Sequence, residues 1–193
     1  MNKALLPLAA LVLLAACSGG KKDDAEAVEF FPVSSYLHSQ VAHIDTSLYP
    51  LRKIVRHNGH SDTTFLHRNQ FRKEAADFLA VPDIASDKWR DEYTESRIYD
   101  DLLKRAVFSY TPKEEDAPVL RQDVTIEPSA EEGDAVRTIF INQITDAADS
   151  TVQKKMLWEV GRRFQVVTTV SRKGVPDDTR TLEVWWAPLP SAE

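Results

Sequence analysis

Two of the five histidines in this chain have a spacing that could bind a metal ion. His57 and His60 flank Asn58-Gly59, the dipeptide most typical of a two-residue β-hairpin turn. On such a hairpin the two histidines are direct cross-strand neighbours, and Asp62 projects from the same face. Two imidazoles and a carboxylate are ligands that zinc and related transition metals accept. The alternative is that His, Ser and Asp are simply common residues at an exposed hairpin tip.

Trp185 is a second candidate, for contact with a ligand or a protein partner. Trp185 and Trp186 are consecutive in a predicted strand, so their side chains point to opposite faces. Trp186 shares its face with Leu182 and Val184 and is expected in the core, whereas Trp185 shares its face with Glu183. An exposed tryptophan could stack on a sugar ring or anchor a protein. The alternative is that another part of the protein covers Trp185.

The basic residues form one dense group. Lys154-Lys155 and Arg162-Arg163 flank a predicted strand turn. A solvated hairpin end explains this group, and a local contact with an anion is the other interpretation. The formal net charge of −6 argues against nucleic acid as a partner, because phosphate binding needs a basic surface.

The positions of the six glycines exclude several enzyme classes. Gly19-Gly20 precede the predicted domain, and each of the other four marks a separate predicted turn. Phosphate-cradling loops and dinucleotide fingerprints are therefore absent, which excludes the usual nucleotide sites. The sequence also lacks the G-x-S-x-G and H-E-x-x-H motifs. We therefore expect a non-enzymatic protein without a cofactor, although a carboxylate pair assembled from distant strands stays open.

The single cysteine follows a segment typical of a secretory signal. Met1-Asn2-Lys3 gives a positive start, and residues 4–16 carry no charge. This run is shorter than the ~20 residues that span a bilayer. Leu14-Ala15-Ala16-Cys17 resembles the lipobox of bacterial lipoproteins. The resemblance implies that residues 1–16 are removed and that Cys17 carries acyl chains such as palmitate.

Two further motifs predict where the lipoprotein is sorted. Ser18, in place of an aspartate, resembles the outer-membrane sorting pattern. Lys21-Lys22-Asp23-Asp24 resembles the export signal of surface lipoproteins in the Bacteroidota. We therefore expect a lipid-anchored protein of the outer membrane, with surface exposure favoured over a periplasm-facing position.

The chain beyond the signal divides into a tether and a domain. Residues 17–31 are polar and lack an apolar period, so we expect a flexible acidic tether. Residues 32–193 are expected to form a single domain. Pro32 is suited to begin a helix, and apolar residues then recur every three or four positions. These residues are Val33, Leu37, Val41, Ile44 and Leu48.

Further elements follow the predicted hairpin of residues 52–57 and 60–66. A second helix is predicted to be capped by Asn69 and to end before Pro82. Its expected buried residues are Phe71, Ala75, Phe78 and Leu79. Residues 83–104 are ambiguous and suggest short helical pieces. The residues that suggest them are Trp89, Tyr93, Leu102 and Leu103.

From Ala106 onward the apolar period is two, which is typical of β-strands. Phe108 and Tyr110 begin this alternation, and further strands are predicted at 120–127, 135–144, 152–160, 163–172 and 180–187. Short turns between sequential strands favour antiparallel pairing. The predicted fold is therefore α+β: N-terminal helices and a β-hairpin, then a twisted antiparallel meander with the helices packed on one face.

Phrases of the sequence resemble uncharacterised lipoproteins of the Bacteroidota. They are residues 78–84 (FLAVPDI), residues 153–158 and Phe164-Gln165-Val166-Val167. The resemblance covers most of the domain but implies no activity and no functional residue. The sequence thus predicts a lipid-anchored binding or structural module with a possible envelope protein partner. The alternative is a metal-binding protein or metal-assisted hydrolase that uses His57, His60 and Asp62.

Overall fold

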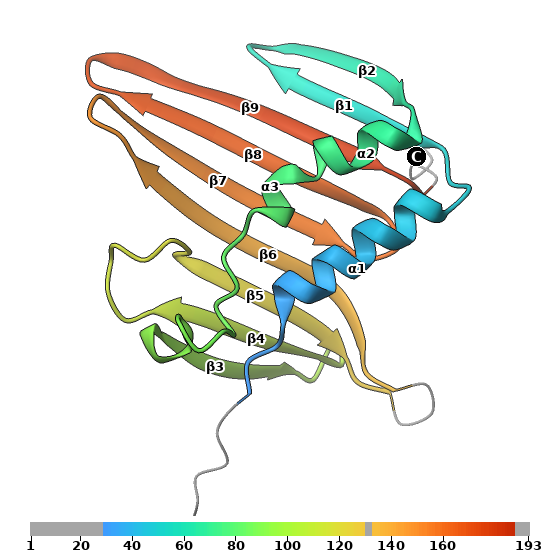
Figure 1. Cartoon of the computed structure of the whole chain (residues 1–193), viewed down its shortest axis with the longest axis vertical. Coiled ribbons are helices and arrows are strands. Elements are labelled where there is room, and N and C mark those ends of the chain that lie inside the picture. Colours follow the sequence, from blue (N-terminus) through green and yellow to red (C-terminus); the bar gives the residue numbers. More distant parts are fainter. Residues whose placement is uncertain (1–28, 130–132, 188–193) are drawn as a thin grey trace, which may run out of the picture.

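Nine strands form one antiparallel sheet in the computed structural model, which describes residues 29–129 and 133–187 (Figure 1). Their order is β2-β1-β9-β8-β7-β6-β5-β4-β3. Together with a few helices, this sheet confirms the predicted α+β class, and most of the regular structure is β. The predicted signal peptide, Cys17 and the tether as far as residue 28 lie outside the described residues.

The elements have the following bounds. The helices are α1 (Val33–Thr46), α2 (Arg68–Glu74), α3 (Ala76–Leu79) and the single 3₁₀ turn η1 (Arg90–Glu92). The strands are β1 (Leu51–His57), β2 (His60–Leu66), β3 (Tyr93–Asp100), β4 (Arg105–Pro112), β5 (Arg121–Glu127), β6 (Ala135–Asp146), β7 (Ser150–Glu159), β8 (Arg163–Arg172) and β9 (Val175–Trp185).

The predicted meander is present, and the predicted hairpin extends it. Strands β3 to β9 are paired in chain order, and β1 then pairs with β9. The turn between β1 and β2 has positive φ at Asn58 (49°) and Gly59 (75°), as the Asn-Gly signature requires. The first and last strands of the sheet in chain order, β1 and β9, are therefore neighbours, which brings residues 52–57 beside residues 180–185.

Two local predictions were wrong. The segment Tyr93–Asp100 is strand β3, not helix, and of the described residues 83–104 only η1 is helical. β3 is an edge strand with most of its side chains exposed, so it lacks the alternation that identifies a half-buried strand. The second helix starts after His67 rather than Asn69, and it is interrupted at Ala75 to give α2 and α3.

The helices and the sheet contribute to the same hydrophobic core. Four of the five predicted core residues of α1 are buried, but Leu48 lies beyond the helix end and is 97% exposed. The ring of Phe71 in α2 lies 5.7 Å from that of Trp186 and 5.9 Å from that of Phe164, between centroids. Phe78 in α3 lies 5.2 Å from Trp158. Among the described residues, no helix is both long and apolar enough to cross a membrane.

The register divides the side chains of the sheet into two faces. We name them the Trp185 face and the Trp186 face, after the last residue of β9 and the residue that follows it. On the Trp186 face, Val184 of β9 lies opposite Phe164 of β8, which lies opposite Trp158 of β7. On the Trp185 face, Glu183 of β9 lies opposite Gln165 of β8. The buried aromatic cluster belongs to the Trp186 face.

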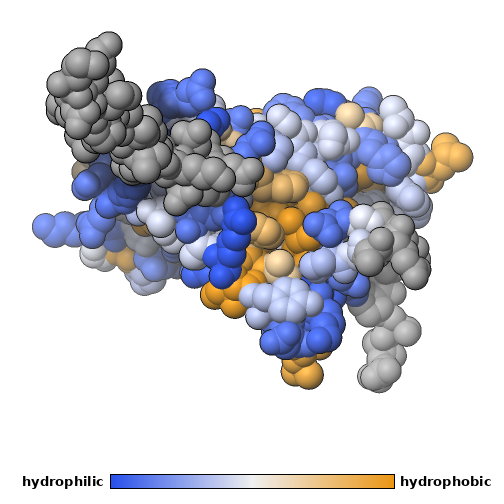
Figure 2. Space-filling view, turned by 90° about the horizontal axis from the view of Figure 1, so that it is seen from below, coloured by the Kyte–Doolittle hydropathy of each residue, from blue (hydrophilic) through white to orange (hydrophobic). Residues whose placement is uncertain are grey.

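The edge strand β3 exposes apolar side chains. Figure 2 views the molecule from below, the side on which β3 lies in Figure 1, and shows hydrophobic residues gathered among hydrophilic ones. The large exposed hydrophobic residues of β3 and the turn after it are Ile98, Tyr99, Leu102 and Leu103. An edge strand with exposed apolar side chains is a natural contact surface for another protein.

Candidate functional site

The hairpin tip has the geometry predicted from its turn. His57 and His60 are direct cross-strand partners, and Asp62 pairs with Val55 on the same face. However, His57 Nε2 lies 2.6 Å from Oδ1 of Asp178 in β9. Within residues 29–129 and 133–187, no three His, Cys, Asp or Glu side chains are arranged to hold a metal ion. The structure therefore gives the predicted set His57, His60 and Asp62 no geometric support.

Trp185 lies on the predicted face, but it is buried rather than exposed. Its side chain points to the face opposite Trp186, and the residue is only 7% exposed. Arginines from the neighbouring turn and strand contribute to its cover. The guanidinium carbon of Arg163 lies 4.7 Å from the centroid of the indole ring, and that of Arg162 lies 5.8 Å from it. Of the two alternatives left open by the sequence, the structure shows the covered one, and cation–π contacts contribute to the cover.

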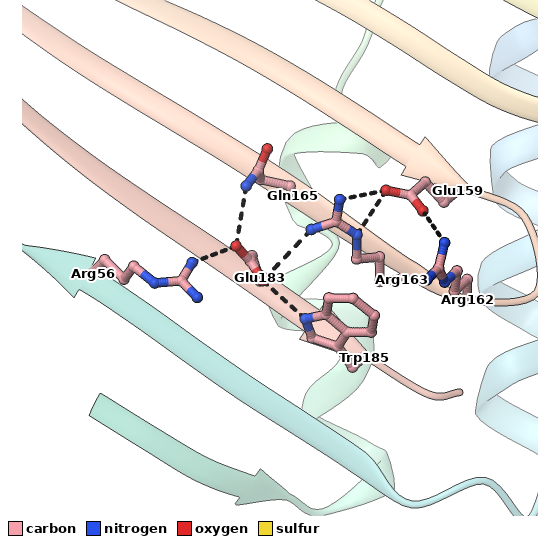
Figure 3. Close-up of polar contacts among 7 residues, drawn as sticks. All are labelled: Arg56, Glu159, Arg162, Arg163, Gln165, Glu183 and Trp185. Atoms are coloured by element: carbon pink, nitrogen blue, oxygen red, sulfur yellow. Dashed lines mark hydrogen bonds and ion pairs between the residues drawn. The ribbon is translucent and has the colours of Figure 1, made fainter. Parts of the chain in front are cut away.

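Glu183 fixes the orientation of the indole ring (Figure 3). Its carboxylate accepts a hydrogen bond of 2.9 Å from Nε1 of Trp185 and one of 3.1 Å from Nε2 of Gln165. Arg56 of β1 forms an ion pair with the same carboxylate. Glu183 is only 5% exposed, so these contacts are shielded from water.

The same contacts keep Glu183 ionised. Burial alone raises the pKa of its carboxyl, but hydrogen bonds from Trp185, Arg56 and Gln165 and the charge of Arg56 lower it more. The net result is a pKa below the ordinary value for glutamate. Such a carboxylate accepts hydrogen bonds, and it is a poor general acid near neutral pH.

A second glutamate neutralises the arginines that cover Trp185 (Figure 3). Nε of Arg163 donates to Oε1 of Glu159 over 2.7 Å, and Nη1 of Arg162 lies 3.4 Å from Oε2. Nη1 of Arg163 also lies 3.6 Å from Glu183. The two arginines of the basic group predicted from the sequence therefore pair with glutamates of the protein itself. Of its two lysines, Lys154 pairs with Asp77 over 2.6 Å.

One cross-strand row connects these residues to a pocket. The register places Phe65, Arg52, Trp185, Arg163 and Glu159 as consecutive direct neighbours on β2, β1, β9, β8 and β7. At the Phe65 end of this row lies a cavity of about 460 Å³. Its lining residues are Tyr49, Pro50, Arg52, Phe65, Trp185, Trp186 and Ala187.

Among the described residues, Arg52 is the one charged residue that lines this pocket. Its Nε is buried without a hydrogen-bond partner, and in the described part of the chain no carboxylate forms an ion pair with its guanidinium. The four arginines around Trp185, which are Arg52, Arg56, Arg162 and Arg163, outnumber the two glutamates, Glu159 and Glu183. Among the described residues, this end of the Trp185 face therefore carries excess positive charge in an acidic protein.

The sequence indicated only part of this site. The alternation within β9 correctly placed Glu183 and Trp185 on one face. Arg52 and Arg56, which are four residues apart on the same face of β1, were not recognised as their partners. The pairing of β1 with β9 spans most of the chain, and a single sequence holds no local signal for it.

Comparison with known proteins gives no relative from which to transfer a function. The chain matches no family model, no curated protein and no solved structure. The function is therefore argued from the Trp185 site and its pocket.

Proposed function

We propose that this chain is a lipid-anchored protein of the bacterial outer membrane whose sheet domain binds another molecule and does not catalyse a reaction. The observation that carries the binding function is the aromatic pocket beside Trp185, in which the lining residue Arg52 has no ion-pair partner among the described residues. The observation that carries the anchor is the sequence Leu14-Ala15-Ala16-Cys17.

Trp185 is held as a fixed surface, which favours binding. Glu183 orients its indole Nε1, and Arg163 packs against the ring. A side chain that is already ordered loses little conformational entropy when a ligand arrives. Aromatic pockets with few polar groups are typical of small-molecule sites.

The lowered pKa of Glu183 and the ion pairs of Glu159 favour binding over acid–base catalysis. A catalytic general acid near neutral pH needs a raised pKa. Contacts with Trp185, Arg56 and Gln165 lower the pKa of Glu183 against the effect of burial. Glu159 is occupied by ion pairs with Arg162 and Arg163.

We also infer that α1, α2 and α3 cover the Trp186 face and leave the Trp185 face for a ligand. Two ion pairs support this arrangement, because Lys53 of β1 contacts Glu74 of α2, and Lys154 of β7 contacts Asp77 of α3. Lys53 and Lys154 both belong to the Trp186 face by register. The apolar edge β3 then offers a separate surface for an envelope protein partner.

Substitution of Cys17 tests the anchor. Cys17→Ala removes the acylated thiol, so we expect the protein to move from the outer-membrane fraction to the soluble fraction, whereas Ser18→Ala should stay with the membrane. Several acyl chains anchor a protein stably because each buried methylene contributes about 0.8 kcal/mol. If Cys17→Ala still fractionates with the outer membrane, the anchor is wrong. Protease treatment of intact cells then tests surface exposure: a protein on the outer surface should be cleaved.

Thermal shift of the full chain in detergent tests the binding function. A panel of neutral, carboxylated and phosphorylated small molecules should contain at least one that raises the melting temperature of the wild type, because a ligand at a hundredfold its Kd stabilises by about 2.7 kcal/mol. Trp185→Ala should remove that shift. If no member of the panel shifts the transition, the pocket is not a small-molecule site.

A further inference from the structure

The two arginines that flank Trp185 differ in one respect. Arg163 and Arg52 are its direct neighbours on β8 and β1. Arg163 forms ion pairs with Glu159 and Glu183. Arg52 has no such partner among the described residues, although it is half-buried and its Nε has no contact with water. Because no carboxylate of the described residues pairs with Arg52, an anion in the pocket would meet a guanidinium charge without a competing partner.

The walls of the pocket suit a ring. Tyr49 and Phe65 are 47% and 76% exposed, so their rings are available for stacking, while Trp185 and Trp186 are almost fully buried within the lining. A volume of about 460 Å³ lies within the usual range for small-ligand sites, so one or two rings fit.

We propose that this pocket binds a small ligand in which a ring carries a carboxylate, with the carboxylate paired to Arg52 and the ring stacked against Tyr49 and Phe65. The proposal rests on the proposed binding function and names its ligand class. It commits to a single negative charge because Arg52 is the one charged residue in the lining that the described residues form.

The geometry of the guanidinium favours a carboxylate over a phosphate. A planar guanidinium matches a planar carboxylate through two parallel hydrogen bonds. The other nearby arginines, Arg56, Arg162 and Arg163, already pair with Glu159 or Glu183 and offer no second free charge to a dianion. Acidic sugars and aromatic acids share the required chemistry, a ring with an attached carboxylate.

Calorimetric titration with matched pairs of compounds tests the proposal. The full chain in detergent micelles is titrated with glucuronate and glucuronamide, and with 4-hydroxyphenylacetate and its amide. We expect at least one acid to bind and its amide to bind at least tenfold more weakly, since the amide lacks the charge. The acid that binds identifies the source as sugar or aromatic.

Two variants that each remove one positive charge distinguish an ion pair between the ligand and Arg52 from an effect of net charge. Arg52→Gln should weaken binding of the acid at least tenfold and leave binding of the amide unchanged. Arg121→Gln removes the same charge from an exposed position on β5 and should leave both affinities unchanged. Equal binding of acid and amide, or an Arg52→Gln protein that binds the acid like the wild type, would overturn the proposal.

A third variant guards against misfolding of Arg52→Gln. Phe65 is 76% exposed, so Phe65→Ala should keep the fold. It should still weaken binding of the acid severalfold, because the stacking contact is lost. If neither acid binds, the ligand class is wrong. The proposed function fails separately, by the absence of any shift in the broader panel.

Discussion

Trp185 and Trp186 are adjacent in the chain and almost equally buried, at 7% and 3% exposure, but by different means. Trp186 lies in a cluster of aromatic rings, 5.3 Å from Trp158 and 5.7 Å from Phe71 between centroids. Trp185 is held by a hydrogen bond to Glu183 and by the guanidinium of Arg163. One tryptophan is covered by apolar surface and the other by ionised side chains.

This difference separates the part of the molecule that holds the fold from the part that is suited to binding. Burial of apolar surface is favourable without directional contacts and does not depend on ionisation. Burial beneath charged groups requires their ion pairs and hydrogen bonds, and it leaves a directional polar surface. The Trp186 face should therefore dominate stability, whereas the Trp185 face should respond to ligands and to acid.

The largest expected effect is in the aromatic cluster. Phe71→Ala removes a fully buried ring that contacts Trp158, Phe164 and Trp186. We expect a loss of about 3–5 kcal/mol in the free energy of unfolding, measured by urea denaturation. Phe65→Ala, on the opposite face and exposed, should change it by less than about 0.5 kcal/mol. Similar losses for both variants would contradict the division between the faces.

The sequence predicted features that depend on neighbouring residues. The period of two from Ala106 onward gave the later strands of the meander, and Asn58-Gly59 gave the first hairpin. The alternation also gave the opposite orientations of Trp185 and Trp186. Each of these follows from the local geometry of a strand or a turn.

The sequence could not predict contacts between distant segments. Arg56 and Glu183 pair across 127 positions, and His57 and Asp178 across 121. Both contacts exist because β1 joins the sheet beside β9. A hairpin signal fixes which two strands pair with each other, and it says nothing of the sheet edge that they join. The sequence left open whether Trp185 is exposed or covered, because its cover comes from β1 and from the arginines at the turn before β8.

The second-largest expected effect is a loss of stability at alkaline pH, and it arises on the Trp186 face. Burial raises the pKa of Tyr110 to about 12, although the hydrogen bond from the backbone of Phe31 lowers it. Because the folded pKa is raised, the contribution of Tyr110 to stability is complete below pH 10 and is lost as pH rises through 12. Two pKa units correspond to about 2–3 kcal/mol. Tyr110→Phe should remove this part of the loss of stability, measured as the free energy of unfolding by urea denaturation between pH 9 and 12. If the variant loses as much stability as the wild type over this range, the assignment to Tyr110 is wrong.

A smaller effect in acid is expected on the Trp185 face. Despite its burial, Glu183 has a lowered pKa through Trp185, Arg56 and Gln165. Its contribution to stability is therefore present above the ordinary glutamate pKa and is lost as pH falls through the lowered value. Glu183→Gln should cost about 1–2 kcal/mol at neutral pH, because Arg56 then lacks its charged partner.

Comparison of acid profiles checks this assignment. The loss of stability on acidification should be shallower in Glu183→Gln than in the wild type, and indole fluorescence should report a changed environment of Trp185. Asp45→Asn is the control, because Asp45 pairs with the exposed side chain of Arg72 outside this network. An acid profile of Glu183→Gln that follows the wild type would show that Glu183 does not couple the Trp185 face to pH.

The smallest effect is expected at the hairpin tip, which belongs to the Trp186 face by register but is exposed. The side chains of His57 and Asp178 are 41% and 48% exposed, so their pair should contribute at most about 1 kcal/mol. His57→Ala and Asp178→Asn, alone and combined in a double-mutant cycle, measure that contribution by urea denaturation. A small coupling would show that burial, rather than position on this face, determines the contribution to stability.

Zinc titration of the same variants tests the metal-binding alternative. Because the described residues provide no three-residue ligand group, we expect zinc to leave the melting temperature of the wild type unchanged. Binding at a hundredfold the Kd would instead stabilise the fold by about 2.7 kcal/mol. A zinc-dependent rise that His57→Ala abolishes would establish a metal site at the hairpin tip. It would also make an exposed part of the Trp186 face functional, contrary to the assignment of ligand binding to the Trp185 face.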